Sequence, residues 1–166
     1  MREILSNVVD EKWVYSEENV MIVAGVVADR IQELTGDSVK LFLGRIECSK
    51  GGHLAHTDEL TLRDGCVYKP KNEEENLTAY SCGVLLSKDY LGGNFQFKEP
   101  HKPISKKKHY LNGVVFDVEQ KHLVTPHKEG DRWVLLMWFT TRSDADLVIS
   151  CHKDYPHQEI SSVLAL

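Results

Sequence analysis

Between residues 17 and 35 the apolar positions recur every three or four residues, which is the period of an amphipathic helix. Ser16 stands where a helix N-cap is expected, acidic residues fill the first turn, and Gly36 follows the last apolar position. The pattern predicts one helix that packs against a sheet. Its apolar face consists of Val20, Val23, Val27, Ile31 and Leu34.

From residue 39 onward the pattern changes to short β-rich runs separated by Gly, Pro, Lys and Asp. Many short strands of this kind predict a sandwich, a jelly roll or a barrel. Two polar connections, 59–77 and 99–112, are long enough to be functional loops, and we expect them to form a mobile lid. The β-rich runs are VKLFLGRIE (39–47), HLAHTD (53–58), TAYSCGVLLS (78–87), GNFQFK (93–98), GVVFDV (113–118), KHLVTP (121–126) and DRWVLLMWFTT (131–141).

A chain of 166 residues with 42% hydrophobic residues is expected to form one domain. We divide it into an N-terminal helical support (1–38), a β core (39–142) and a C-terminal tail (143–166) whose structure the pattern does not define.

The net charge of −5 argues against nucleic acid and anionic membranes as partners, because both attract cationic surfaces. The longest apolar run, 20–28, is too short to span a bilayer, and the amino terminus lacks the features of a signal peptide.

The four cysteines form no CxxC pair and are expected to be free thiols. A zinc site can be drawn from Cys48, His53, His56 and Cys66, although their spacing matches no common zinc pattern.

Candidate chemistry begins with His56-Thr57-Asp58. On a strand, the period of two places His56 and Asp58 on one face, where they can share a metal ion. Iron(II) oxygenases hold the metal with two His and one carboxylate, so a second His must come from elsewhere, and His122 opens a later β-rich run. A second HxD triplet, at 152–154, lacks such a partner, and we interpret it as surface residues.

Arg132 alternates with Val134, Leu136 and Trp138 along the last long run, so the four share one face. An arginine among apolar side chains is costly unless a buried anion meets it, and a dicarboxylate would supply that anion through a two-pronged contact. Alternatively, Arg132 begins its strand at a solvated rim.

These parts resemble the iron(II)- and 2-oxoglutarate-dependent dioxygenases, specifically the prolyl-hydroxylase branch, and most closely its prolyl 3-hydroxylase (leprecan) group. The resemblance covers about residues 40–142 and implies a mainly β fold with a flanking helix and a double-stranded β-helix (jelly-roll) core. It implies that His56, Asp58 and His122 bind iron and that Arg132 binds the distal carboxylate of 2-oxoglutarate. The matching parts are the HxD triplet, a strand and acidic-aromatic-Gly-Gly turn in GVLLSKDYLGGNFQF (83–97), His122 followed ten residues later by Arg132, and WFTT from Trp138.

The sequence departs from this pattern at two tyrosines that relatives often carry. Leu85 stands where one of them touches the distal carboxylate, and Tyr80 is the candidate replacement, although alternation places it on the opposite face. The tyrosine often found about ten residues before the HxD is also missing.

The implied activity is hydroxylation of a peptidyl substrate, most simply at proline, with release of succinate and CO2. The implied cofactors are Fe(2+), 2-oxoglutarate, O2 and L-ascorbate as reductant, and the implied partner is a proline-containing protein or peptide. The cytoplasm is the expected compartment for a complete chain, and the endoplasmic reticulum lumen is the expected compartment for a fragment of a secretory enzyme.

Two alternative functions stay open: a dioxygenase that acts on another residue or a small molecule, and a non-catalytic β-domain. Alkylation-repair relatives usually carry a second Arg six residues after the first, where this chain has Trp138.

Overall fold

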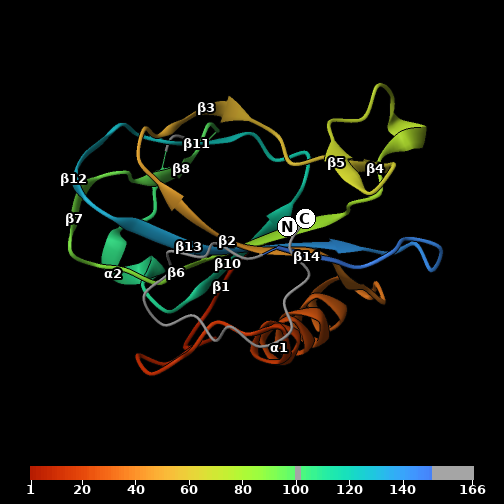
Figure 1. The fold of residues 1–166 in the computed structure, drawn as a ribbon, viewed down its shortest axis with the longest axis horizontal. Helices are drawn as coiled ribbons and strands as arrows, with labels where there is room; N and C mark the ends of the chain where they lie inside the picture. The colour runs from red at the N-terminus through yellow and green to blue at the C-terminus, as the bar shows by residue number, and fades with distance from the viewer. Residues whose placement is uncertain (100–101, 151–166) are drawn as a thin grey trace.

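The computed structural model describes residues 1–99 and 102–150, which form two facing, mainly antiparallel sheets with one long helix on the outside. In Figure 1 helix α1 covers the lower face of the large sheet, and β3, β8 and β11 lie above its upper face. This layered β arrangement with a flanking helix confirms the predicted fold class.

The large sheet has six strands. Strand β14 runs parallel to β2, and the other pairs are antiparallel. In spatial order the strands are β1 (Arg2–Leu5), β10 (Gly113–Asp117), β6 (Tyr80–Leu85), β13 (Arg132–Thr140), β2 (Lys40–Ser49) and β14 (Val148–Ser150).

The second sheet has four strands, and two short two-stranded ladders extend the structure. The second sheet consists of β3 (His53–His56), β11 (His122–Val124), β8 (Phe95–Phe97) and β9 (Lys102–Pro103). The ladders are β12 (His127–Gly130) with β7 (Tyr90–Gly92), and β4 (Thr61–Arg63) with β5 (Cys66–Tyr68). A 3-10 turn (Glu73–Glu75) and a short helix α2 (Lys106–His109) complete the elements.

Helix α1 (Glu17–Thr35) begins and ends where the sequence predicts. The Ser16 hydroxyl accepts a hydrogen bond from the backbone N–H of Asn19, and Gly36 adopts the left-handed conformation with φ of 83°. Leu34, at the last turn, remains 40% exposed. The helix is thus buried along one face as far as Ile31 and is more exposed in its last turn. Its buried side chains are Val20, Val23, Ala24, Val27 and Ile31.

The side chains of strand β13 point alternately to the two faces of the large sheet. Its residues Trp133, Leu135, Met137 and Phe139 pack in the core cluster under α1. The alternate residues Arg132, Val134, Leu136 and Trp138 line a cavity between the two sheets, as alternation predicts.

All seven predicted β-rich runs contain a strand, but the structure adds elements outside them. Residues before 38 contribute the edge strand β1 as well as the helix, and the predicted connection 59–77 contains the β4–β5 hairpin. The connection 99–112 contains β9 and α2. Cys151 and the second HxD triplet, 152–154, lie outside the described residues.

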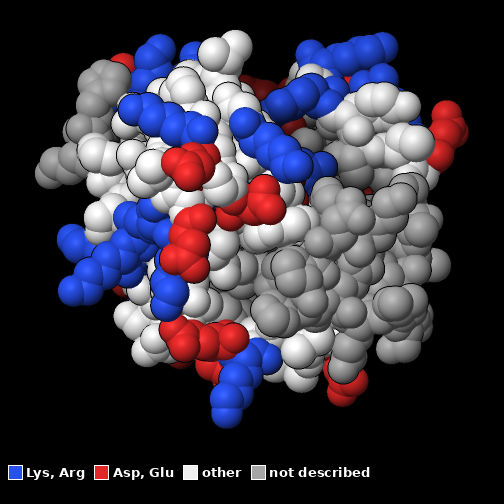
Figure 2. Space-filling model, turned by 60° about the vertical axis from the view of Figure 1, so that its left-hand side comes forward, with Lys and Arg blue, Asp and Glu red and all other residues white. Residues whose placement is uncertain are grey.

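Basic and acidic side chains lie next to one another across much of the described surface in Figure 2. No helix in residues 1–99 and 102–150 combines the length and apolar character that a membrane span requires.

Candidate metal and cosubstrate site

Two neighbouring strands bring His56, Asp58 and His122 together. His122, the first residue of β11, pairs directly with His56, the last residue of β3. Asp58 follows two residues later, where its backbone N–H donates to the carbonyl of Val118 at 2.8 Å. The strand therefore ends before Asp58, and this backbone contact fixes the turn that carries the carboxylate.

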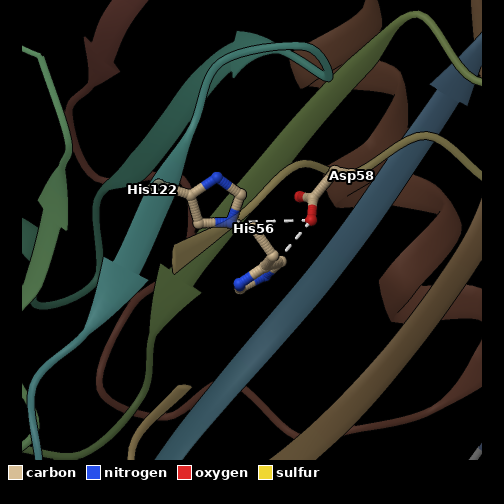
Figure 3. A group of neighbouring side chains, drawn as sticks. All are labelled: His56, Asp58 and His122. Carbon is tan, nitrogen blue, oxygen red and sulfur yellow. Dashed lines mark ion pairs between the residues drawn. The ribbon is translucent and has the colours of Figure 1, made fainter. Parts of the chain in front are cut away.

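The three side chains converge on one point (Figure 3). The Nε2 atoms of His56 and His122 each lie 3.5 Å from Oδ1 of Asp58. One candidate ligand atom from each of the three residues lies within 4.8 Å of the other two. In the described part of the chain, these are the residues grouped closely enough to hold a metal ion. The prediction that they come together is confirmed.

Both imidazoles are oriented by backbone carbonyls. Nδ1 of His56 is 2.7 Å from the carbonyl oxygen of Leu54, and Nδ1 of His122 is 2.9 Å from that of Gln120. When Nδ1–H donates to these carbonyls, Nε2 keeps its lone pair and faces Asp58. The donor set therefore fits a divalent metal ion that takes two imidazoles and one carboxylate.

Burial differs around the three residues. The His122 side chain is 6% exposed and that of His56 is 38% exposed, so the site is open on the His56 side. Burial lowers the pKa of His122, although the carboxylate of Asp58 acts in the opposite direction. A lowered pKa favours the neutral imidazole, which is the form that binds metal.

The three residues line a cavity of about 210 Å³ between the two sheets. Lys69, from the connection 59–77, also lines it, and the ammonium of Lys69 donates to the carbonyl of Thr57 beside the candidate ligands. The cavity walls are largely apolar, as expected for a site that limits access of water. Among the apolar lining residues are Val114, Phe116, Val124, Val134 and Leu136.

Arg132 lies at one end of this cavity and is 4% exposed. Its side chain forms no ion pair with any described carboxylate, and its Nε has no hydrogen-bond partner within residues 1–99 and 102–150. Burial lowers the pKa of this guanidinium, while Tyr90 opposes the shift. The interpretation of Arg132 as a residue at a solvated rim is therefore wrong, and a buried cation of this kind fits a carboxylate ligand.

A tight turn holds the Arg132 side chain in place. Gly93 has φ of 59°, and a Cβ there would lie 2.9 Å from Cδ of Arg132. Tyr90, three residues earlier and 5% exposed, is hydrogen-bonded through its hydroxyl to Arg132. The imidazole of His127 stacks on the Tyr90 ring with centroids 5.7 Å apart. The acidic-aromatic-Gly-Gly segment thus shapes the arginine end of the cavity.

Tyr80 does not reach this cavity, so its prediction as a cosubstrate contact is wrong. It packs in the core cluster on the α1 side of the sheet, and its hydroxyl donates to the carboxylate of Asp37. Leu85, which stands at the position of the expected tyrosine, is buried against Tyr90 and Val134. Tyr90, which the sequence analysis did not single out, is the tyrosine that contacts Arg132.

His109 is a second residue that the sequence analysis missed. It is 3% exposed, lines the cavity, and its Nε2–H donates to the carbonyl of Gly83 at 3.0 Å. Burial lowers its pKa to about 4, and the nearby charge of Arg132 acts in the same direction. The ring lies over Gly83, where a Cβ would be 3.8 Å from Nε2, an ordinary van der Waals contact.

The alternative zinc site from Cys48, His53, His56 and Cys66 does not form. Cys48 packs at the edge of the core under α1 rather than in the cavity, and Cys66 is exposed on the β4–β5 hairpin. The three cysteines in the described residues, Cys48, Cys66 and Cys82, are free, as expected.

Comparison with known proteins finds similarity in structure alone. No protein-family model and no curated protein sequence matches this chain. A viral collagen prolyl hydroxylase from Paramecium bursaria Chlorella virus-1, solved as a 2-oxoglutarate complex, has a TM-score of 0.57 at 14% identity, covering 84% of this chain and 94% of its own. A Pseudomonas putida prolyl-4-hydroxylase has a TM-score of 0.51 at 16% identity, covering 77% and 68%. The chain therefore has the fold of the iron(II)- and 2-oxoglutarate-dependent oxygenases.

Proposed function

We propose that the protein is an iron(II)- and 2-oxoglutarate-dependent oxygenase that hydroxylates a peptidyl substrate, at proline residues. The observation that carries this proposal is one cavity that joins the His-Asp-His group to a buried arginine without a carboxylate partner among the described residues. When bound, iron(II) and 2-oxoglutarate supply the oxidising chemistry that inserts oxygen from O2 into a C–H bond, with succinate and CO2 as products.

The side chains of this protein bind and orient. His56, Asp58 and His122 would hold iron from one side, so that the opposite side remains open to cosubstrate and oxygen. Arg132 would bind the distal carboxylate of 2-oxoglutarate, and its hydrogen bond to Tyr90 limits the orientations of the guanidinium. The apolar walls of the cavity keep water away from the reacting atoms.

Support for a proline-containing substrate comes from two sources. The two solved structures with the same fold are described as a collagen prolyl hydroxylase and a prolyl-4-hydroxylase. The His56 side of the site is exposed enough for a chain segment to approach. The finer assignment to the prolyl 3-hydroxylase (leprecan) group depends on the SKDYLGGNFQF (87–97) resemblance, and the need for ascorbate is a prediction from the same source.

The proposal is tested by mass spectrometry of proline-containing peptides after incubation with protein, iron, ascorbate and 2-oxoglutarate. A mass increase of one oxygen atom, absent with Asp58→Ala, is the expected result, and fragmentation locates the modified residue. Peptides in which proline is replaced by alanine should remain unmodified. An oxygen atom added at a different residue would replace the proline assignment with another amino acid.

A further inference from the structure

The cavity contains an unusual number of buried polar atoms without partners. Among the described residues, six buried side-chain nitrogen or oxygen atoms have no hydrogen-bond partner, and five of the six belong to residues that line this cavity. Because buried polar groups in folded proteins are nearly always hydrogen-bonded to protein, water or a ligand, these atoms mark a polar binding surface inside the cavity. The five atoms are Nε of Arg45, Oγ of Ser49, Oγ of Ser81, Nε of Arg132 and Nε1 of Trp138.

These atoms form two groups at opposite ends of β13. At one end Arg132 of β13 lies directly opposite Ser49 of the neighbouring strand β2. At the other end Trp138 pairs with Ser81 of β6, and the guanidinium carbon of Arg45 lies 5.3 Å from the centroid of the Trp138 ring. Six residues of strand separate the two ends, or roughly 20 Å. One ligand of the size of 2-oxoglutarate cannot satisfy both groups.

The second group lies beside the candidate metal ligands. Ser81 pairs directly with Phe116 of β10, and the Phe116 ring lies 4.8 Å from the ring of His122. Ser81 is 3% exposed and Trp138 is 6% exposed, so both atoms are withdrawn from solvent. A molecule bound here would lie next to the metal site, away from the arginine end.

The two ends differ in charge. Arg132 has no ion-pair partner in the described part of the chain, whereas Nη2 of Arg45 lies 2.8 Å from Oε2 of Glu47. The charge of Arg45 is therefore already balanced, and its Nε adds a hydrogen-bond donor without an uncompensated charge. The indole Nε1–H of Trp138 is also a donor only. This end accordingly fits an uncharged acceptor better than an anion.

We infer that Arg45, Ser81 and Trp138 form an amide pocket that binds a carbonyl oxygen of the substrate backbone and so selects which carbon faces the metal. The inference depends on the proposed function, because it assigns the substrate to the same cavity. It specifies a peptide amide rather than the carboxylate of a free amino acid.

Ser81→Ala distinguishes binding from a structural role. The Ser81 hydroxyl has no partner in the described residues, so its removal eliminates an unsatisfied polar atom, and the melting temperature should stay the same or rise. Affinity for an amide should nevertheless fall roughly 2- to 10-fold, the range expected for one hydrogen bond. Ser38→Ala, at an exposed position, is the matched control and should change neither quantity.

The probe is N-acetyl-L-proline methylamide, titrated into protein loaded with zinc(II) and 2-oxoglutarate so that no turnover occurs. Nuclear magnetic resonance follows the indole N–H signals of the three tryptophans, and Trp138→Phe identifies the signal of Trp138. The expected result is a saturable downfield shift of the Trp138 signal, with Trp13 and Trp133 unchanged. Free L-proline, which carries a carboxylate in place of the amide, should leave the Trp138 signal in place.

An unshifted Trp138 signal, or equal affinity of wild-type protein and Ser81→Ala for the probe, would overturn the amide pocket. A Trp138 shift with free L-proline and none with the amide would overturn it too. The titration is repeated without zinc and cosubstrate, where the Trp138 shift is again expected. Loss of 2-oxoglutarate binding in separate titrations would contradict the proposed function, while the response of Trp138 to the probe still decides the pocket.

Discussion

The guanidinium of Arg132 and the hydroxyl of Tyr90 are hydrogen-bonded to each other at the buried end of the cavity. The two residues are far apart in sequence, and the pairing of β7 with β12, in which Tyr90 lies opposite Gly130, brings them together. Because Arg132 forms no ion pair with a described carboxylate, Tyr90 is its principal side-chain partner in the described structure. Tyr90 therefore positions the guanidinium without lining the cavity itself.

Tyr90→Phe should weaken 2-oxoglutarate binding roughly 2- to 10-fold, because the guanidinium loses the hydrogen bond that orients it. Isothermal titration calorimetry with a metal ion present measures this change. Metal affinity should stay the same, since Tyr90 lies at the arginine end of the cavity. Tyr68→Phe, at a 51% exposed position, is the control. Equal 2-oxoglutarate affinity in Tyr90→Phe and wild-type protein would exclude a positioning role.

Arg132→Met should reduce 2-oxoglutarate affinity by about 2 to 5 kcal/mol, the loss measured when one partner of a buried charge pair is truncated. The melting temperature should not fall, because methionine fills similar volume and removes a buried charge that has no described carboxylate partner. Titration calorimetry and thermal unfolding test the two quantities separately. A large drop in melting temperature with unchanged cosubstrate affinity would show a structural arginine instead.

Asp58→Ala and His122→Ala should each lower metal affinity by more than about 100-fold, because second-shell contacts alone contribute about 10- to 100-fold. Manganese(II) or cobalt(II) binding to the metal-free protein measures the change. His53→Ala is the control: His53 lies on the same strand as His56 but pairs with Glu47 and is absent from the converging group. Similar losses in all three variants would indicate a different ligand set.

His109 should make the protein less stable at acid pH. Its pKa is about 4 in the folded protein and 6.5 when unperturbed, so the unfolded chain binds the proton more tightly. The associated stability is fully present above pH 6.5 and is lost as pH falls toward 4, by about 3 kcal/mol at 1.36 kcal/mol for each unit of pKa. Urea unfolding at several pH values measures this loss.

His109→Gln is the matched comparison, since glutamine can still donate to the Gly83 carbonyl but does not titrate. Between pH 6.5 and 4 its stability should decline less than that of the wild-type protein. Parallel pH profiles for the two proteins would mean that other groups account for the acid sensitivity.

The sequence predicts those parts of the fold that depend on local chemistry. The Ser16 and Gly36 caps define helix α1, and strict alternation from Arg132 to Trp138 identifies which side chains of β13 enter the cavity. Strands with weak alternation, such as β1 and the β4–β5 hairpin, are short and lie at edges. Their formation depends on pairing with distant segments, which the local pattern does not encode.

The candidate ligands can be predicted from the sequence because the HxD triplet is followed by His122, with Arg132 ten residues after it. The buried residues that surround these ligands and Arg132 could not be predicted in the same way. Tyr80 carries the right side chain on the wrong face, as alternation from Leu85 already indicates, whereas Tyr90 reaches Arg132 through a turn whose path depends on tertiary structure. His109 ends a lysine-rich segment typical of a solvated loop, and its burial depends on a tertiary contact, the hydrogen bond to the carbonyl of Gly83.

The most direct test measures succinate released from 2-oxoglutarate by wild-type protein and by Asp58→Ala, with and without iron. Wild-type protein should release succinate only when iron is present, and Asp58→Ala should release none above the protein-free background. Absence of iron-dependent succinate from wild-type protein that binds metal would favour a non-catalytic β-domain. Undiminished release from Asp58→Ala would contradict a metal site built from His56, Asp58 and His122.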